Sequence, residues 1–291
     1  TNQQRRETAK RKLERQLERR AQQAKRRRLL TIIGGAAALV AAIAVVVTLV
    51  VTNRDAGKSS TTASGAPSDT AGPSTAPPAT GGLPAFKAGA NLGANCQYPA
   101  SPEPASKKVE PPKAGKVPTE PATVSASMAT NQGNIGLQLD NAKAPCTVNS
   151  FASLAQKGFF NDTPCHRLTT SPSLAVLQCG DPTGQGTGGP GYQFANEYPT
   201  DQYPAGDPGL QQPVTYPRGT LAMANAGPDT NGSQFFLVYK DSQLPPNYTV
   251  FGTIDKTGLA TLDKIAAAGV AGGGADGKPA TDVKIKSVLL D

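Results

Sequence analysis

Few of the residue types that carry enzyme chemistry are present in this sequence. There is one histidine, His166, and the four cysteines form no C-x-x-C pair, which argues against a zinc site of the usual ligand types. No G-x-S-x-G motif occurs, and His166 has no evident acidic partner for a triad. The glycine-rich residues 184–191 lack a following Lys-Ser/Thr, so they predict a tight or mobile loop and not a phosphate-binding loop. We therefore expect no covalent chemistry, no metal and no other cofactor.

Three stretches of the sequence are distinctive. They are CHRL at residues 165–168 with VLQCGDPTGQGTGG at 176–189, GTLAMANAGPDTNGSQFFLVY at 219–239, and YTVFGTI at 248–254. Together they closely resemble the cyclophilin family of peptidyl-prolyl cis-trans isomerases, over roughly residues 122–291. The resemblance implies a mainly β fold, an eight-stranded antiparallel barrel capped by two helices. It also implies an isomerase (rotamase) that acts on proline-containing polypeptides in protein folding.

Rotation about an X-Pro bond needs little polar machinery. The barrier is about 18–20 kcal/mol because the amide is conjugated. As the amide twists, conjugation is lost and the proline nitrogen becomes a hydrogen-bond acceptor, so a donor placed there favours the transition state. By resemblance, Arg167 is this donor and Gln178 is its positioning partner. A guanidinium suits the task because it stays charged and carries several N–H groups.

The resemblance also implies a peptide-binding surface. Its expected residues, which line a proline pocket, follow the substrate backbone or contact a flanking carbonyl, are Val176, Ala224, Asn225, Gln234, Phe236, Leu244 and Tyr248. Phe235 and Phe236 alternate along the chain, so one of them must face the core, and the family pattern places Phe236 in the pocket. Tyr248 stands where many members have His.

Two positions depart from the family pattern. The family usually has a Phe between the Arg and the Gln, but residues 167–178 contain none, run longer than usual, and put Leu174 or Ala175 at that wall. Gln243 replaces the Trp that precedes the pocket Leu in many eukaryotic members. We therefore expect at most weak binding of the cyclic peptide cyclosporin.

The hydrophobic pattern predicts the elements that position these residues. Apolar and polar residues alternate through residues 124–139, which is typical of a hairpin with one buried face. Pro145 opens a helical pattern that ends near Gly158. A second helix is expected over residues 259–268, and alternation returns at residues 283–286 in a final strand. Many short strands with two helices suggest a closed or nearly closed antiparallel sheet with helices over its openings.

The basic charge is confined to one end of the chain. Residues 1–28 hold twelve Lys and Arg against three Glu, so the rest is nearly neutral and we expect no nucleic-acid partner. Residues 29–52 are 24 residues without a charge, which predicts an uncleaved single transmembrane helix in the plasma membrane. Because the basic run lies before this span, residues 1–28 are expected in the cytoplasm and the following domain outside it.

Composition predicts the remaining organisation. Residues 53–119 are rich in Pro, Ala, Ser, Thr and Gly, which indicates a disordered linker, followed by the isomerase-like domain at residues 120–291. Around Cys96 and Tyr98 the linker has an island that we expect to dock on the domain or to form a disulfide. With Cys146, Cys165 and Cys179, an exported chain could form two disulfides in three connectivities, or leave the thiols free as small apolar side chains.

Three functions remain open at this stage. The first is a membrane-tethered isomerase that helps exported or cell-envelope proteins to fold. The second is a proline-peptide binding module with little turnover, and the third is an envelope protein whose anchor and tether matter more than its barrel. Isomerase turnover that depends on Arg167 would favour the first of these.

Overall fold

The structure is a computed structural model that describes residues 81–291. The predicted basic tail (1–28), membrane span (29–52) and first part of the linker (53–80) lie outside the described residues. Within residues 81–291, no helix has the length and apolar character needed to cross a membrane.

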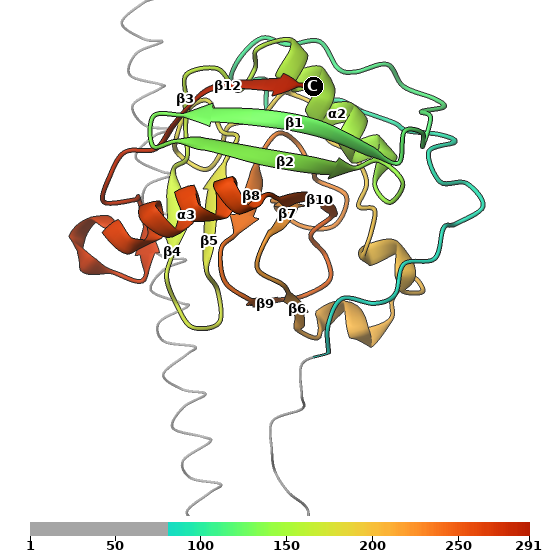
Figure 1. Cartoon of the computed structure of the whole chain (residues 1–291). Helices are drawn as coiled ribbons and strands as arrows, with labels where there is room; N and C mark the ends of the chain where they lie inside the picture. The colour runs from blue at the N-terminus through green and yellow to red at the C-terminus, as the bar shows by residue number, and fades with distance from the viewer. Residues whose placement is uncertain (1–80) are drawn as a thin grey trace, which may run out of the picture. The chain divides into compact units, whose positions relative to one another are not determined.

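The core of the domain is one curled antiparallel sheet (Figure 1). Its ten strands follow the order β11-β4-β5-β8-β7-β10-β2-β1-β12-β3, and β6 pairs separately with β9. The strands are β1 (Thr123–Thr130), β2 (Asn134–Asp140), β3 (Thr163–Pro164), β4 (Arg167–Thr169), β5 (Val176–Cys179), β6 (Val214–Tyr216), β7 (Thr220–Met223), β8 (Phe235–Val238), β9 (Ser242–Leu244), β10 (Val250–Ile254), β11 (Asp276–Gly277) and β12 (Lys284–Leu290).

The two ends of this sheet meet in one stretch of chain. β3 pairs with β12 at one end, and β4 pairs with β5 and β11 at the other. Only Cys165 and His166 separate β3 from β4, so the backbone itself joins the two ends. The prediction of eight strands therefore differs from the structure: eight strands lie between β11 and β3, and these two-residue strands add to the count where the sheet curls back on itself.

Two α-helices pack on the sheet, as predicted. α2 (Pro145–Gln156) lies against β12 and β2, and α3 (Lys256–Ala268) lies against β2. The first begins at Pro145, and Gly158 just beyond it has a φ of +61°, which an L side chain rarely adopts. The second begins three residues before its predicted start because the Asp255 carboxylate accepts a hydrogen bond from the Gly258 N–H (2.6 Å) and caps it. Short 3₁₀ turns complete the chain at η1 (Thr200–Gln202), η2 (Pro208–Gln211) and η3 (Ala271–Gly273).

A continuous apolar core lies between the sheet and α2. In the β1–β2 hairpin, Met128, Ile135 and Leu137 are fully buried, as the alternation of the sequence requires. Phe151 of α2 meets Phe235 of β8 edge to face, with ring centroids 5.4 Å apart. Such aromatic pairs add about 0.5–1.5 kcal/mol beyond their area burial, so α2 and the strands near the site are held as one unit.

Residues 81–119, which we term the wrapping segment, pack along the outside of the domain and so differ from the expected disordered linker, whereas the island around Cys96 and Tyr98 docks on the domain as expected (Figure 1). Cys96 forms a disulfide with Cys146 at the start of α2. The Tyr98 ring is buried, and its hydroxyl donates to the Cys146 carbonyl (2.8 Å). The Lys107 ammonium donates to the carbonyls of Gly158 and Phe159 just after α2 (2.7 and 3.0 Å). Low hydrophobicity did not prevent ordering because one disulfide and these polar contacts replace a large apolar interface.

Glu197 holds the start of α2 from a distant loop. Its carboxylate is only 8% exposed and accepts hydrogen bonds from the N–H groups of Cys146 and Thr147 (3.0 and 2.8 Å) and from the Thr147 hydroxyl (2.7 Å). These are the backbone donors that a helix leaves unpaired at its first turn. Burial nevertheless raises the pKa of Glu197 to about 7, because removal from water disfavours the charged form.

The first prediction concerns the disulfide of the wrapping segment. Replacing Cys96 and Cys146 by Ser should lower the free energy of unfolding by about 4 kcal/mol, since the bond closes a loop of 50 residues. Urea unfolding followed by tyrosine fluorescence measures the loss. The same change at Cys165 and Cys179 is the comparison and should cost less, because that loop spans 14 residues. An unchanged urea midpoint in the first variant would contradict the anchoring of the segment.

A second prediction follows from Glu197. Between pH 4.5 and about 7 the folded chain binds more protons at this carboxyl than the unfolded chain does, so its contribution to stability falls as pH rises. The loss should reach roughly 3 kcal/mol across that interval. Urea unfolding at several pH values should show a less negative slope for Glu197→Gln than for the parent protein. Equal slopes in the two proteins would refute the assignment.

Candidate active site

Three adjacent strands bring the polar and apolar site residues together. In the sheet register, Arg167 of β4 lies opposite Gln178 of β5, and Gln178 lies opposite Phe236 of β8. Phe236 in turn lies opposite Ala222 of β7. Directly opposed residues of antiparallel strands project from the same face, so their side chains meet. Residues separated by almost 70 positions thereby form one row across the sheet.

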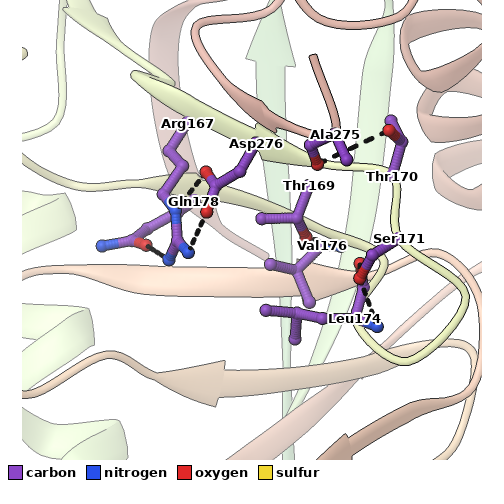
Figure 2. A network of polar contacts seen from close by, with 9 residues as sticks. All are labelled: Arg167, Thr169, Thr170, Ser171, Leu174, Val176, Gln178, Ala275 and Asp276. Carbon is purple, nitrogen blue, oxygen red and sulfur yellow. Dashed lines mark hydrogen bonds and ion pairs between the residues drawn. The ribbon is translucent and has the colours of Figure 1, made fainter. Parts of the chain in front are cut away.

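The Arg167 guanidinium is held on two sides (Figure 2). Its Nε and Nη2 donate to the two carboxylate oxygens of Asp276 in β11 (2.8 and 2.7 Å). Its Nη1 donates to the Gln178 amide oxygen (3.2 Å). The fork of two parallel hydrogen bonds fixes the plane of the guanidinium, because Nε and Nη2 cannot move independently.

This pairing leaves the guanidinium with free donors. Of its five N–H groups, Asp276 takes two and Gln178 takes one, so one on Nη1 and one on Nη2 are not used by these partners. The hydrogen bond from Arg167 lowers the pKa of Asp276, and the same bond raises the pKa of Arg167. Both groups are therefore charged at neutral pH, and the pair stays formed.

The hydrogen-bond chain continues beyond Gln178. The Gln178 Nε2 donates to the Gln234 amide oxygen (2.9 Å), and the Gln234 Nε2 donates to the carbonyls of Gly186 and Gly188 (3.0 Å each). The side chain of Gln234, expected to contact a substrate carbonyl, thus gives both amide hydrogens to the glycine-rich loop. In this state it fixes which way the Gln178 amide points.

Asp181 organises that glycine-rich loop. It is fully buried, and its carboxylate accepts the backbone N–H groups of Thr183 (2.7 Å), Gly186 (2.7 Å) and Thr187 (3.1 Å). These hydrogen bonds oppose the effect of burial and leave the pKa of Asp181 below its usual value. The loop is accordingly a tight turn built around a buried charge.

A pocket of about 240 Å³ opens beside Arg167, and we term it the apolar pocket after the apolar side chains of Leu174, Val176, Phe236 and Leu244 in its lining. Its lining combines all of the predicted site residues except Gln234 with one residue of the β4–β5 loop: Arg167, Leu174, Val176, Gln178, Ala224, Asn225, Phe236, Leu244 and Tyr248. Phe236 lines this pocket, whereas Phe235 is fully buried in the main core. Of the two candidates for the missing aromatic wall, Leu174 lines the pocket and Ala175 lies in the core.

The pocket walls are supported by neighbouring contacts. Tyr248 meets Phe236 edge to face, with ring centroids 5.8 Å apart. The Asn225 Nδ2 donates to the Asn247 carbonyl (2.8 Å), so this side chain is engaged within the protein. The Ala175 N–H donates to the Ser242 hydroxyl (3.0 Å), which ties the longer β4–β5 connection to β9.

A larger cavity of about 690 Å³ adjoins the apolar pocket. The two share Gln178, Ala224 and Asn225, so they form one continuous surface. The larger cavity is otherwise walled by the glycine-rich loop, by residues near Thr230 and Gln234, and by residues 101–104 of the wrapping segment.

Some features of the site gave no signal in the sequence. Asp276 lies 109 positions from Arg167, in a Gly-rich connection, and nothing in its spacing points to the guanidinium. Cys165 and Cys179 form a disulfide next to Arg167 and Gln178, a pairing that remained open before. Both ring nitrogens of His166 are buried without a hydrogen-bond partner among residues 81–291, and burial lowers its pKa.

The chemistry available to this site is electrostatic. Among residues 81–291 no group of three or more His, Cys, Asp or Glu side chains is arranged to hold a metal ion. The arrangement consists of a fixed, charged donor beside an apolar hollow. It can stabilise electron density that appears on a ligand atom held at the mouth of the pocket.

Comparisons with known proteins agree with this geometry. A family model described as cyclophilin type peptidyl-prolyl cis-trans isomerase/CLD matches residues 125–289. The chain is 75% identical over 217 residues to "Probable peptidyl-prolyl cis-trans isomerase B" of Mycobacterium tuberculosis (strain ATCC 25618 / H37Rv), covering 75% of this chain and 69% of that protein. It is 74% identical over 209 residues to the protein of the same name from Mycobacterium leprae (strain TN), covering 72% and 71%.

A solved structure is also similar. A crystal structure of a Cryptosporidium parvum cyclophilin type peptidyl-prolyl cis-trans isomerase has 29% sequence identity and a TM-score of 0.47, covering 58% of this chain and 98% of that chain. The mycobacterial likeness covers a larger share of the chain than residues 125–289, so it extends into the wrapping segment.

Proposed function

Because the chain belongs to the cyclophilin-type peptidyl-prolyl cis-trans isomerases, we propose that Arg167 is the donor that stabilises the twisted X-Pro amide. The proline ring enters the apolar pocket against Phe236, and Ala224 and Asn225 run along the substrate backbone. No bond is broken, so no nucleophile or metal is required. A rate gain of about 10⁵ corresponds to roughly 7 kcal/mol of differential stabilisation.

The observation that supports this role is the pair of unused N–H groups on a fixed guanidinium at the pocket. In either planar ground state the proline nitrogen is conjugated and accepts poorly. In the twisted state its lone pair becomes available, and a charged donor already in place binds it without reorganisation. Arg167 thus discriminates between the two states by the electronic structure of the substrate.

Asp276 and Gln178 serve as positioning residues in this proposal. Arginine has long flexible torsions, and an unrestrained guanidinium would lose conformational entropy on binding the transition state. The carboxylate fork and the Gln178 amide remove that freedom in advance. Because the negative charge of Asp276 offsets part of the positive charge of Arg167, we assign the main benefit of this pair to orientation of the guanidinium.

We further propose that the enzyme acts outside the plasma membrane on exported or cell-envelope proteins. Two features support this location: the uncharged residues 29–52 follow a basic run, and all four cysteines are paired. Residues 1–28 are then cytoplasmic, and the isomerase domain is tethered to the membrane surface.

Weak cyclosporin binding belongs to the same proposal. Gln243 stands where many eukaryotic family members have Trp. Its Nε2 donates to the Thr215 hydroxyl (2.9 Å) across the β6–β9 pair. This amide offers a smaller apolar surface than an indole ring, and its donor is engaged within the protein. We therefore expect cyclosporin to inhibit the isomerase only weakly, at concentrations well above those at which substrate peptides bind the proline pocket.

A third prediction tests the role of Arg167. Arg167→Ala should lower kcat/KM for an X-Pro peptide about 100-fold or more, the scale seen when one transition-state donor is removed. Arg167→Lys should recover little, because an ammonium cannot keep both the Asp276 fork and the Gln178 contact. The protein used should retain residues 81–119, which pack on the domain.

The matched control is Arg218→Ala. Arg218 also forms a two-oxygen pair with an aspartate, Asp263, and is similarly exposed, but it lies outside the pocket. The Arg218→Ala variant should therefore turn over the peptide as fast as the parent protein. If the parent protein binds the peptide but turns it over no faster than Arg167→Ala does, the result would favour a proline-peptide binding module. If the parent protein shows neither peptide affinity nor turnover, the result would favour the anchor and tether as the functional parts.

A fourth prediction concerns Asp276. Asp276→Ala should lower kcat about tenfold with little change in KM, because the guanidinium loses its fixed plane while the apolar pocket keeps its shape. Asp263→Ala removes the equivalent fork from Arg218 and is the matched control. A coupled isomerisation assay measures both variants. Equal activity of Asp276→Ala and the parent protein would exclude the positioning role.

A further inference from the structure

The larger cavity beside the proline pocket has one wall that the barrel itself does not provide. Ser101, Pro102, Glu103 and Pro104 line it, and these residues precede the region matched by the family model. The opposite walls come from the glycine-rich loop and from Gln234. The wrapping segment therefore reaches the surface on which a substrate peptide would lie.

Hydrogen bonds on both sides hold this wall in place. At its first residue, the Ser101 N–H donates to the Gly191 carbonyl (3.0 Å). After it, the N–H and hydroxyl of Ser106 both donate to the Gly189 carbonyl (2.9 and 3.0 Å). Gly191 has a φ of +80°, and a Cβ there would come within 2.9 Å of Ala105, so the close approach requires glycine. The segment is thus built against the loop at both ends of the wall.

Glu103 is the one charged side chain among the residues that line this cavity. It is exposed, and among residues 81–291 no Lys, Arg or His forms an ion pair with it. Pro102 and Pro104 on either side restrict its backbone, since proline fixes its own φ and keeps the preceding residue extended. The carboxylate is therefore presented by a stiff stretch of chain to an otherwise uncharged hollow.

A carboxylate in this position favours a positive partner. A substrate extended from the proline pocket passes the shared residues Gln178, Ala224 and Asn225 and enters the larger cavity. At about 3.3 Å per residue, one of the residues flanking the proline must place its side chain there. A lysine or arginine side chain can reach the carboxylate while its methylene groups lie along the cavity wall.

We propose that Glu103 is a specificity-determining residue that selects substrates with a lysine or arginine close to the proline. This inference rests on the proposed function in one respect: a single substrate peptide must occupy both cavities. The wrapping segment then has two roles: it stabilises α2, and it discriminates between substrates by the residues close to the isomerised bond.

The test uses the full chain and a set of proline peptides that carry a single Lys, or Gln in its place, at each position from three before to three after the proline. The measured quantity is the Lys-to-Gln ratio of kcat/KM, and of affinity by fluorescence anisotropy, at low and at high salt. We expect a ratio of about three at one position in the parent protein, falling at high salt, which is the scale of an exposed ion pair.

Variants of the wrapping segment decide the outcome. Glu103→Gln should bring the ratio at that position to one, and Glu103→Lys should reverse it. Glu110→Gln removes another exposed carboxylate of the same segment, outside the cavity, and should keep the parent ratio. A ratio of one at every position in the parent protein, or a ratio that Glu103→Gln leaves unchanged, would overturn the proposal. Because affinity is measured separately from turnover, the Lys-to-Gln ratio can be determined even if the protein shows no isomerase activity.

Discussion

The fork between Asp276 and Arg167 is the interaction on which the site depends. A guanidinium at the end of a flexible side chain has no fixed plane of its own, and two parallel hydrogen bonds to Asp276 fix it here. Gln178 and Gln234 extend the restraint to a loop that is itself built around the buried Asp181 carboxylate. The site is therefore a single hydrogen-bonded chain that ends at one charged donor, and the apolar pocket opens beside that donor.

The curl of the sheet makes this chain possible. β11 supplies Asp276, β4 supplies Arg167 and β5 supplies Gln178, so the guanidinium and both of its partners lie on three neighbouring strands. The disulfide between Cys165 and Cys179 links the residue two positions before Arg167 to the residue directly after Gln178. The guanidinium and the two groups that hold it therefore all come from paired strands.

The wrapping segment joins stability to recognition. Its disulfide and the Lys107 contacts secure both ends of α2, while the stretch around Glu103 borders the larger cavity. An element with few apolar residues can do this through a small number of specific contacts: a covalent bond, a buried tyrosine, and hydrogen bonds to backbone carbonyls. Composition alone predicts disorder for such a segment, since composition does not record partners far away in the chain.

The sequence by itself determined the family, the hairpin of β1 and β2, both helices, and the residues that meet at the pocket, because these follow from local periodicity and from long motifs. It also indicated that Phe236 faces the pocket, from alternation combined with the family pattern. Only the tertiary structure decided the partner of Arg167, the pairing of the four cysteines, the choice of Leu174 over Ala175 at the pocket wall, and the ordering of residues 81–119. Each of these depends on contacts between distant positions, and spacing along the chain carries no information about which distant groups the curled sheet brings within hydrogen-bonding range.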